Sequence, residues 1–157
     1  MPRMCTERYG VNRPAIFLDI DGVLVTPVSY DVRNNSPLPG FDPSCVNALN
    51  WLTYEADADL VISSSWRRIP TIASLLRARN IAAPVIGQTP DLGDAGRDHE
   101  IMAWLAEHGA RPFIILDDDA QDLARLAPFL VQTDWQHGLM YRHAEQAVGM
   151  LKDQKVL

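Results

Sequence analysis

Cysteine is scarce in this sequence of 157 residues, with only Cys5 and Cys45 present. The two cysteines form no CxxC pair and no spacing typical of zinc ligands. This scarcity excludes a disulfide-rich scaffold and a cysteine-based zinc finger, because both need several closely spaced cysteines. We therefore expect two ordinary reduced thiols.

Long apolar runs are also missing, and none approaches the roughly 20 residues that a membrane-spanning helix needs. The first residues, MPRMCTERYGVNRP, carry charges but no apolar centre, so they do not read as a secretory signal. We expect a cytoplasmic protein without a membrane partner. Residues 1–14 are predicted to be a flexible tail and residues 15–157 a single domain.

Positive charge is in deficit, since the formal net charge is −6. This balance argues against a general surface for duplex nucleic acid, which must neutralise many phosphates. One local concentration of arginine remains, and it leaves two interpretations open: a solvated helix face, or a set of contacts to backbone phosphates. The residues concerned are Arg67, Arg68, Arg77 and Arg79.

Short apolar runs alternate with segments of helical periodicity along the chain. The apolar runs are nearly continuous, which is typical of strands buried on both faces of a parallel sheet. The pattern predicts an α/β domain with a central, mainly parallel sheet and helices on both faces. We expect strands at 15–20, 58–65, 83–87, 111–119 and 130–133, and helices at 42–56, 70–80, 97–109, 120–129 and 142–154.

Polar clusters follow three of the predicted strands: Asp19 with Asp21, the serines 63–65 and the aspartates 117–119. Each cluster alone has an ordinary structural explanation, a turn or a helix cap. A parallel sheet would bring all three to the edge where α/β proteins bind ligands. Clustered carboxylates favour Mg²⁺, and hydroxyls at a helix start favour a bound phosphate.

The segment IFLDIDGVL resembles the first motif of the haloacid dehalogenase (HAD) superfamily of phosphohydrolases, and the resemblance extends over residues 15–152. It implies a Rossmann-like three-layer domain and an aspartyl-phosphate mechanism. By this resemblance Asp19 is the nucleophile and Asp21 the general acid/base. The acids in FIILDDD resemble the motif that completes a Mg²⁺ site, with Asp118 the first choice and Asp117 beside it. Asp19 and the backbone carbonyl of Asp21 would be the remaining ligands.

Two further motifs imply phosphate ligands. The segment LVISSS resembles the strand whose final hydroxyl holds the phosphate. Ser64 is the favoured residue there, with Ser65 beside it and Ser63 as the alternative register. Arg97, which opens RDHEIMAWL, resembles the basic residue that steadies the phosphoryl group.

The patterns SSSWR, RxxEIxxWL and ILDDD are similar to small phosphatase domains associated with RNA repair. That similarity implies a phosphorylated substrate, which includes the end of an oligonucleotide. Residues 23–42 are too few for a separate cap domain and would form only a flap. Trp66 either stacks on a base or packs the start of a helix. Two functions stay open: a Mg²⁺-dependent phosphatase, and a phosphate-binding or protein-interaction module without turnover, in which Asp19 and Asp21 would have little reason to persist together.

Overall fold

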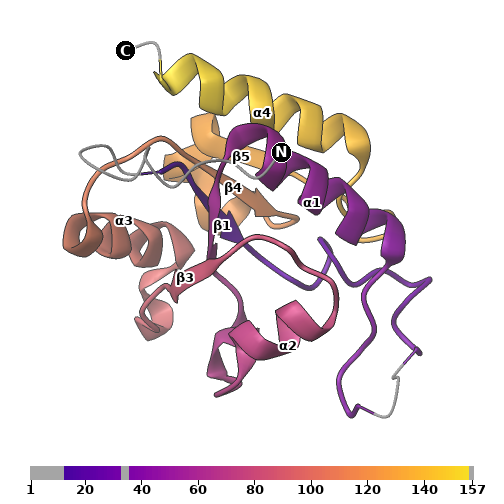
Figure 1. Cartoon of the computed structure of the whole chain (residues 1–157). Coiled ribbons are helices and arrows are strands. Elements are labelled where there is room, and N and C mark those ends of the chain that lie inside the picture. Colours follow the sequence, from indigo (N-terminus) through magenta and orange to yellow (C-terminus); the bar gives the residue numbers. More distant parts are fainter. Residues whose placement is uncertain (1–12, 33–35, 156–157) are drawn as a thin grey trace.

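The computed structural model describes residues 13–32 and 36–155, and within them five parallel strands form one sheet (Figure 1). The strand order is β3-β2-β1-β4-β5, so β1 lies at the centre and the chain winds outward from it in both directions. This topology confirms the predicted α/β domain. The strands are β1 (Ala15–Leu18), β2 (Asp59–Ile62), β3 (Val85–Gln88), β4 (Phe113–Asp117) and β5 (Leu130–Gln132).

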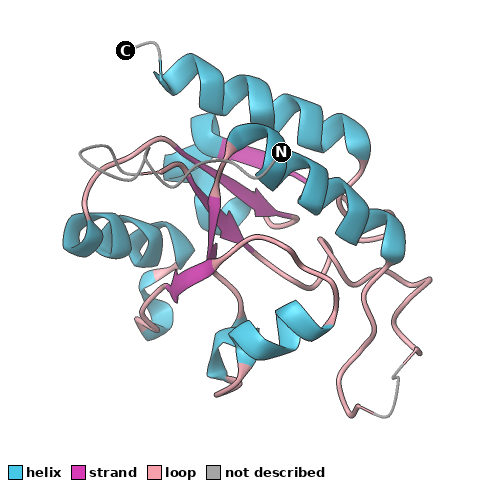
Figure 2. Ribbon diagram, in the orientation of Figure 1, coloured by secondary structure: helices cyan, strands magenta, loops and turns pink. Residues whose placement is uncertain are grey.

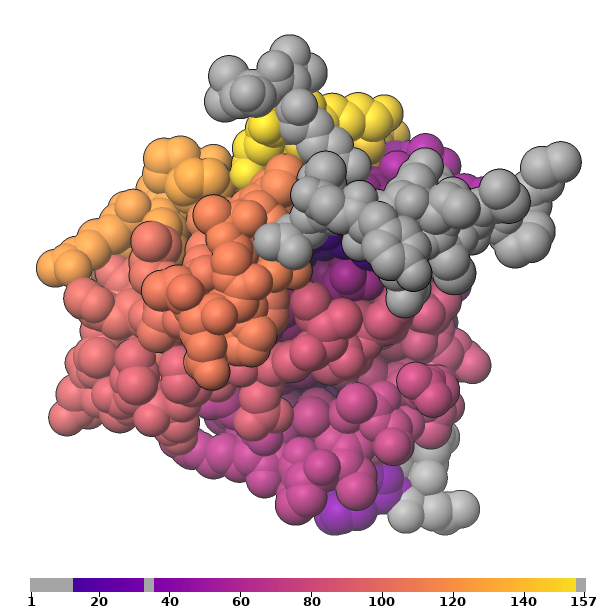
Figure 3. All heavy atoms as spheres, turned by 60° about the vertical axis from the view of Figure 1, so that its left-hand side comes forward, coloured from indigo at the N-terminus to yellow at the C-terminus, as the bar shows by residue number. Residues whose placement is uncertain are grey.

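Helices cover both faces of the sheet and make three layers (Figure 2). The helices α1 (Pro43–Ala56) and α4 (Tyr141–Lys155) pack together on one face. The helix α3 (Arg97–His108) covers the other face beside the 3-10 helix η4 (Gln121–Phe129), as Figure 3 shows from the α3 side. Successive strand side chains point to opposite faces, which explains why the whole of β1 is apolar and buried.

Residues at the predicted helix ends have the expected caps. Asp42 precedes α1, and its carboxylate accepts a hydrogen bond from the backbone N–H of Ser44, while Pro43 occupies the first turn. Helix α3 ends at Gly109, whose φ of 100° suits glycine. These local signals are independent of the rest of the fold, which is why the sequence alone indicated them.

Two predicted helices differ from the expectation. Residues 121–129 form a 3-10 helix, because Leu123 and Leu126 leave helical backbone angles and Pro128 lacks an N–H to donate. The segment after β2 first makes a short 3-10 helix, η2 (Ser65–Arg68), and α2 (Ile72–Ala78) begins two residues after Pro70. Apolar spacing indicated the buried faces of these segments but not their helical type.

No separate cap domain is present among the described residues. Between β1 and α1 the structure has turns and one bridge from Asp21 to Val25, and between β3 and α3 it has a single 3-10 turn, η3 (Gly93–Ala95). We call residues 23–42 the flap, of which 33–35 lie outside the described residues. The site at the carboxyl ends of the strands is therefore covered by short segments only.

The predictions on the chain's beginning and on its thiols are tested only in part. Residues 1–12 of the predicted tail, Cys5 among them, lie outside the described residues, while Arg13 pairs with Asp57 and Asp59 at 3.1 and 3.2 Å. Cys45 is a buried free thiol, and burial raises its pKa to about 11. Among the helices that the structure describes, none has the length and apolar character to cross a membrane. A cytoplasmic location stays a prediction.

Candidate active site

The register of the central strands places Asp19, Ser63 and Asp117 side by side. Leu18, the last residue of β1, pairs with the ends of both β2 and β4. The ladder continues past it, since Ser63 donates its N–H to the Leu18 carbonyl at 2.9 Å and Asp19 donates to the Leu116 carbonyl at 3.0 Å. The three predicted clusters thus meet at the carboxyl edge, where the strand order reverses.

Three carboxylates converge there and fit a hard divalent cation. Asp19, Asp117 and Asp118 each place an oxygen within 4.8 Å of the others, and the first two are buried. Oxygen donors of this kind are the ligands that Mg²⁺ takes in proteins. Gly22 allows the Asp118 side chain to lie this close to the loop after β1. A Cβ at Gly22, whose φ is 79°, would lie 2.3 Å from an Asp118 oxygen.

Arg97 lies directly against these acids. It is the first residue of α3, and its Nη1 is 2.5 Å from an Asp117 oxygen and 3.4 Å from an Asp19 oxygen. Burial, followed by the neighbouring charge of Asp117, raises the pKa of Asp19, and burial raises the pKa of Asp117. Burial alone would lower the pKa of Arg97, but the two carboxylates outweigh it and raise that pKa. The carboxylates of Asp19 and Asp117 therefore hold the Arg97 guanidinium in its charged form, and the acidic group as a whole favours positive charge next to it.

Asp21 lies outside this acidic group. Its side chain is exposed, and its Oδ2 accepts a hydrogen bond of 3.2 Å from the indole N–H of Trp66. Trp66 is only 6% exposed and packs near Phe41 of the flap, with the ring centroids 5.7 Å apart. Of the two interpretations of Trp66, packing is the one that the structure supports, because little of the indole is available to a base.

The serines after β2 differ in their contacts. The Ser64 hydroxyl accepts from the backbone N–H of Trp66 at 3.2 Å and so caps η2. Ser65 is exposed as the first residue of η2. The Ser63 hydroxyl is fully buried and has no hydrogen-bond partner among the described residues. A buried, unpaired hydroxyl level with Asp19 is unusual, because such groups normally have partners.

Asp119, the last acid of its cluster, has a structural role. Its carboxylate accepts from the backbone N–H of Gln121 at 3.0 Å and of Asp122 at 3.4 Å, and so supports the start of η4. Five acids were expected at this edge from the sequence. The structure brings three of them into one group, while Asp21 faces Trp66 and Asp119 faces η4.

Arg67 and Arg68 both form ion pairs with acids of the fold, one pair buried and the other exposed. Arg67 donates to the Glu100 carboxylate at 2.9 Å, and their side chains are only 8% and 4% exposed. This pair ties η2 to the first turn of α3, three residues from Arg97. Arg68 is exposed and pairs with Asp91 at 2.7 Å. The interpretation of Arg67 as a contact to backbone phosphates is therefore not supported.

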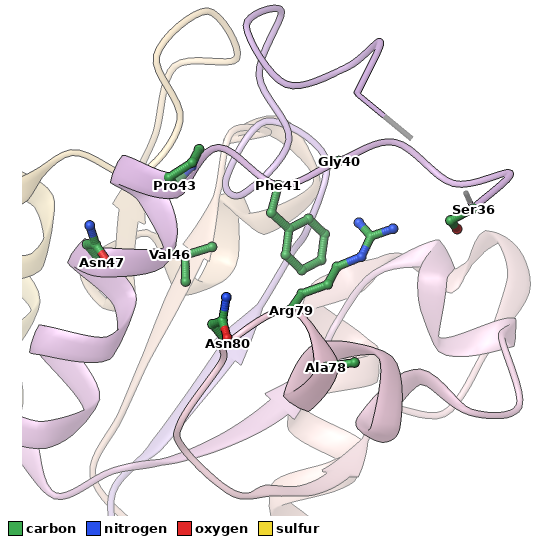
Figure 4. A pocket seen from close by; sticks show the side chains of 9 residues that line it. All are labelled: Ser36, Gly40, Phe41, Pro43, Val46, Asn47, Ala78, Arg79 and Asn80. Atoms are coloured by element: carbon green, nitrogen blue, oxygen red, sulfur yellow. The ribbon is translucent and has the colours of Figure 1, made fainter. Parts of the chain in front are cut away.

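Arg79 fixes the flap to α2. Its guanidinium lies 4.5 Å from the centroid of Phe41 and donates to the carbonyl of Pro39. Figure 4 shows Arg79 and Phe41 side by side in the wall of a hollow between the flap, α1 and α2. The described residues that line this hollow include no carboxylate and no histidine.

A second cleft is lined by carboxylates of the candidate site. It has a volume of about 390 Å³ and is lined by Asp21 and Asp118 together with two exposed aromatic residues, Tyr30 and Trp135. The sequence analysis did not single out either aromatic residue, since they stand 105 positions apart. In the sequence, each of them is only an aromatic residue in a segment that follows a predicted strand, 15–20 for Tyr30 and 130–133 for Trp135.

Comparison with known protein families identifies a match that covers the candidate site. No curated protein matches the chain. The family described as the HAD domain in Swiss Army Knife RNA repair proteins matches residues 15–144, which include every strand and all of the acids discussed above. The fold, the DxD motif after β1 and the acids after β4 agree with that match. The chain therefore belongs to the HAD superfamily, in the family of HAD domains of Swiss Army Knife RNA repair proteins.

Proposed function

We propose that the protein is a Mg²⁺-dependent phosphatase that hydrolyses phosphomonoesters at nucleic-acid or nucleotide ends through an aspartyl-phosphate. One observation carries the proposal: Asp19 lies beside the Arg97 guanidinium and two further carboxylates, while the Asp21 side chain is exposed. The family match supports the nucleic-acid phosphate as the substrate class.

In the first half of the reaction a carboxylate oxygen of Asp19 attacks phosphorus. The bond from phosphorus to the leaving oxygen breaks, and Asp21 gives that oxygen a proton. Arg97, which is 3.4 Å from Asp19, is placed to hold the non-bridging phosphoryl oxygens. A Mg²⁺ ion held by Asp19, Asp117 and Asp118, with the Asp21 carbonyl as the expected fourth ligand, would supply the charge that offsets the dianion.

In the second half Asp21, now a carboxylate, takes a proton from water as the water oxygen attacks phosphorus. The acyl-phosphate bond to Asp19 breaks, inorganic phosphate leaves, and both acids return to their starting forms. Asp21 can serve both steps because it lies at the exposed mouth of the site, where a leaving group and then water can reach it.

The phosphate ligand among the serines is a finer proposal. Ser64 and Ser65 are the residues predicted from the sequence, with Ser63 as the alternative. The structure adds support for Ser63, because its hydroxyl is buried, level with Asp19 and without a partner among the described residues, while Ser64 accepts a hydrogen bond as the cap of η2 and keeps its O–H to donate to a phosphate. A bound phosphate oxygen would give the Ser63 hydroxyl the partner it lacks.

The competing proposal is a phosphate-binding or protein-interaction module without turnover. A module that only binds phosphate would need Arg97 and the serines but neither a nucleophile nor a proton donor. The chain has both Asp19 and Asp21, which a binding module would have little reason to keep together, and burial makes an acid at position 19 unfavourable unless it has a use. This cost favours the enzyme.

The test is a hydrolysis assay with Mg²⁺ on an aryl phosphate, nucleoside 3′- and 5′-phosphates, and oligonucleotides phosphorylated at either end. We expect phosphate release that stops on complete chelation and is absent in Asp19→Asn. Asp119→Asn is the matched control, since this acid supports η4 and not the reaction, and it should retain activity. Binding of phosphate without release from any substrate would favour the module instead.

A further inference from the structure

The cleft next to Asp21 has the features of a binding site for a flat aromatic group. Tyr30 and Trp135 line it and are 52% and 59% exposed, respectively. Val25, Pro27 and Gly22 complete the lining with apolar atoms, and its carboxylates are Asp21 and Asp118. An indole as exposed as that of Trp135, next to a candidate active site, can stack on a ligand.

Asp21 determines which part of the substrate enters this cleft. The proton donor must contact the leaving oxygen, so the leaving group lies where the Asp21 side chain is exposed. The indole N–H of Trp66 can only donate, and it already occupies Oδ2. Trp66 thus fixes the Asp21 side chain at this opening, and the cleft lined by Asp21 receives the group attached to the leaving oxygen.

Trp135 is held at the tip of a tight turn. The Asp134 carbonyl accepts from the N–H of Gly138 at 2.6 Å, and the Asp134 carboxylate accepts from the N–H of Gln136 at 2.7 Å. Gly138 packs so closely that a Cβ there would lie 2.7 Å from the Cys45 sulfur. The turn is thus fixed to the core, and its aromatic tip needs little ordering when a ligand binds.

We propose that this cleft, which Trp135 and Tyr30 line, binds the nucleoside that carries the scissile phosphate, with its base stacked on Trp135. The inference rests on the proposed function and names the group that the site recognises. The described residues that line this cleft and the neighbouring one include the acids Asp21, Asp118 and Asp134. These carboxylates repel further backbone phosphates, so we expect recognition to centre on the terminal nucleoside.

The test compares catalytic efficiency on a nucleoside 5′-phosphate with that on ribose 5-phosphate, which lacks the base. Stacking on an aromatic side chain makes a contribution that corresponds to roughly tenfold or more in affinity. Trp135→Ala should raise KM for the nucleoside phosphate by about tenfold and leave ribose 5-phosphate within about twofold. Trp135→Phe, which keeps a ring, should recover most of the loss. Tyr54→Ala removes an equally exposed aromatic side chain from α1 and should change neither substrate.

A binding measurement without turnover accompanies the assay. Addition of the unphosphorylated nucleoside should quench tryptophan fluorescence in the wild type and in Tyr54→Ala, and not in Trp135→Ala. An oligonucleotide and a mononucleotide with the same terminal base should have similar KM values at low and moderate salt.

The nucleoside site would be overturned, with hydrolysis still present, if Trp135→Ala raised KM equally for the nucleoside phosphate and ribose 5-phosphate. It would also be overturned if the nucleoside quenched the tryptophan fluorescence of Trp135→Ala as much as that of the wild type. A tenfold advantage of the oligonucleotide that salt abolishes would also overturn it. Absence of hydrolysis from every phosphate ester would instead reject the proposed function, and quenching would still report on the cleft.

Discussion

The indole N–H of Trp66 donates to the Oδ2 of Asp21 across 3.2 Å, and this bond links the loop after β2 to the motif after β1. The same indole lies near Phe41 of the flap, and the Arg79 guanidinium is 5.8 Å from its centroid. Of the two acids in the DxD motif, Asp19 belongs to the acidic group and Asp21 lies outside it. Its direction therefore depends on a tryptophan that the flap and α2 hold in place.

We predict that Trp66→Phe slows the chemical step without weakening binding. The ring is kept but the donor is lost, so Asp21 no longer has a fixed orientation toward the leaving oxygen. One hydrogen bond corresponds to roughly tenfold in rate. kcat for alkyl phosphates should fall by about tenfold with KM nearly unchanged, and aryl phosphates, whose leaving groups need little protonation, should lose far less. An equal loss of kcat on both classes would contradict a positioning role for Trp66.

The buried pair of Arg67 and Glu100 is predicted to stabilise the fold and not to bind substrate. Arg67→Met leaves Glu100 as an uncompensated buried charge, which destabilises by about 3 kcal/mol. Removing both charges, in Arg67→Met with Glu100→Leu, should recover much of that loss. Urea unfolding of the two single variants and the double variant measures the coupling.

Arg68→Met is the matched control for this pair, because Arg68 makes an exposed ion pair with Asp91. Its effect on the free energy of unfolding should stay within about 0.5 kcal/mol. If Arg67→Met were as stable as Arg68→Met and instead raised KM for oligonucleotides, the structural role would be wrong and the contact to backbone phosphates would be reinstated.

Asp42 is predicted to stabilise the junction of the flap and α1 in a pH-dependent way. Burial alone would raise its pKa, but hydrogen bonds from Ser44 and Thr26 outweigh burial and lower the pKa. The folded pKa is thus below the unfolded value of about 4. The stabilisation is complete above the unfolded pKa and disappears as the pH falls through the folded pKa.

Asp42→Ala should therefore reduce the free energy of unfolding by about 1 kcal/mol at pH 7 and by less in acid. Asp42→Asn keeps an acceptor for the cap and should lose less at pH 7, with no titration of the effect. A loss in Asp42→Ala that stays constant between neutral pH and pH 3 would contradict this explanation. Chemical unfolding followed by circular dichroism gives the comparison.

The sequence was sufficient for the elements that depend on local patterns. Continuous apolar runs indicated the strands, and Asp42 with Pro43 indicated the start of α1, because caps act within one turn. The convergence of Asp19 with Asp117 and Asp118 also followed, since parallel strands must end at one edge. The structure places Arg97 at this edge too, in contact with Asp19.

The remaining features depend on packing between distant segments. A triplet of serines cannot reveal which hydroxyl caps η2 and which lies level with Asp19, because register is set by pairing with β1. The burial of Arg67 follows from Glu100 in another helix. Tyr30 and Trp135 line the same cleft because the flap and the loop after β5 both reach it. The spacing of residues in the sequence does not predict which distant segments come together in the fold.

The most direct measurement of the central claim is the location of the phosphoryl group in the trapped intermediate. Asp21→Asn keeps the nucleophile but lacks the base that activates water, so the acyl-phosphate should accumulate with a substrate that has a good leaving group. Acid quenching and peptide mass mapping should place one phosphoryl group on Asp19. Asp19→Asn should carry none. A phosphoryl group on Ser63 or another side chain, or full turnover by Asp19→Asn, would contradict the assignment of Asp19 as the nucleophile.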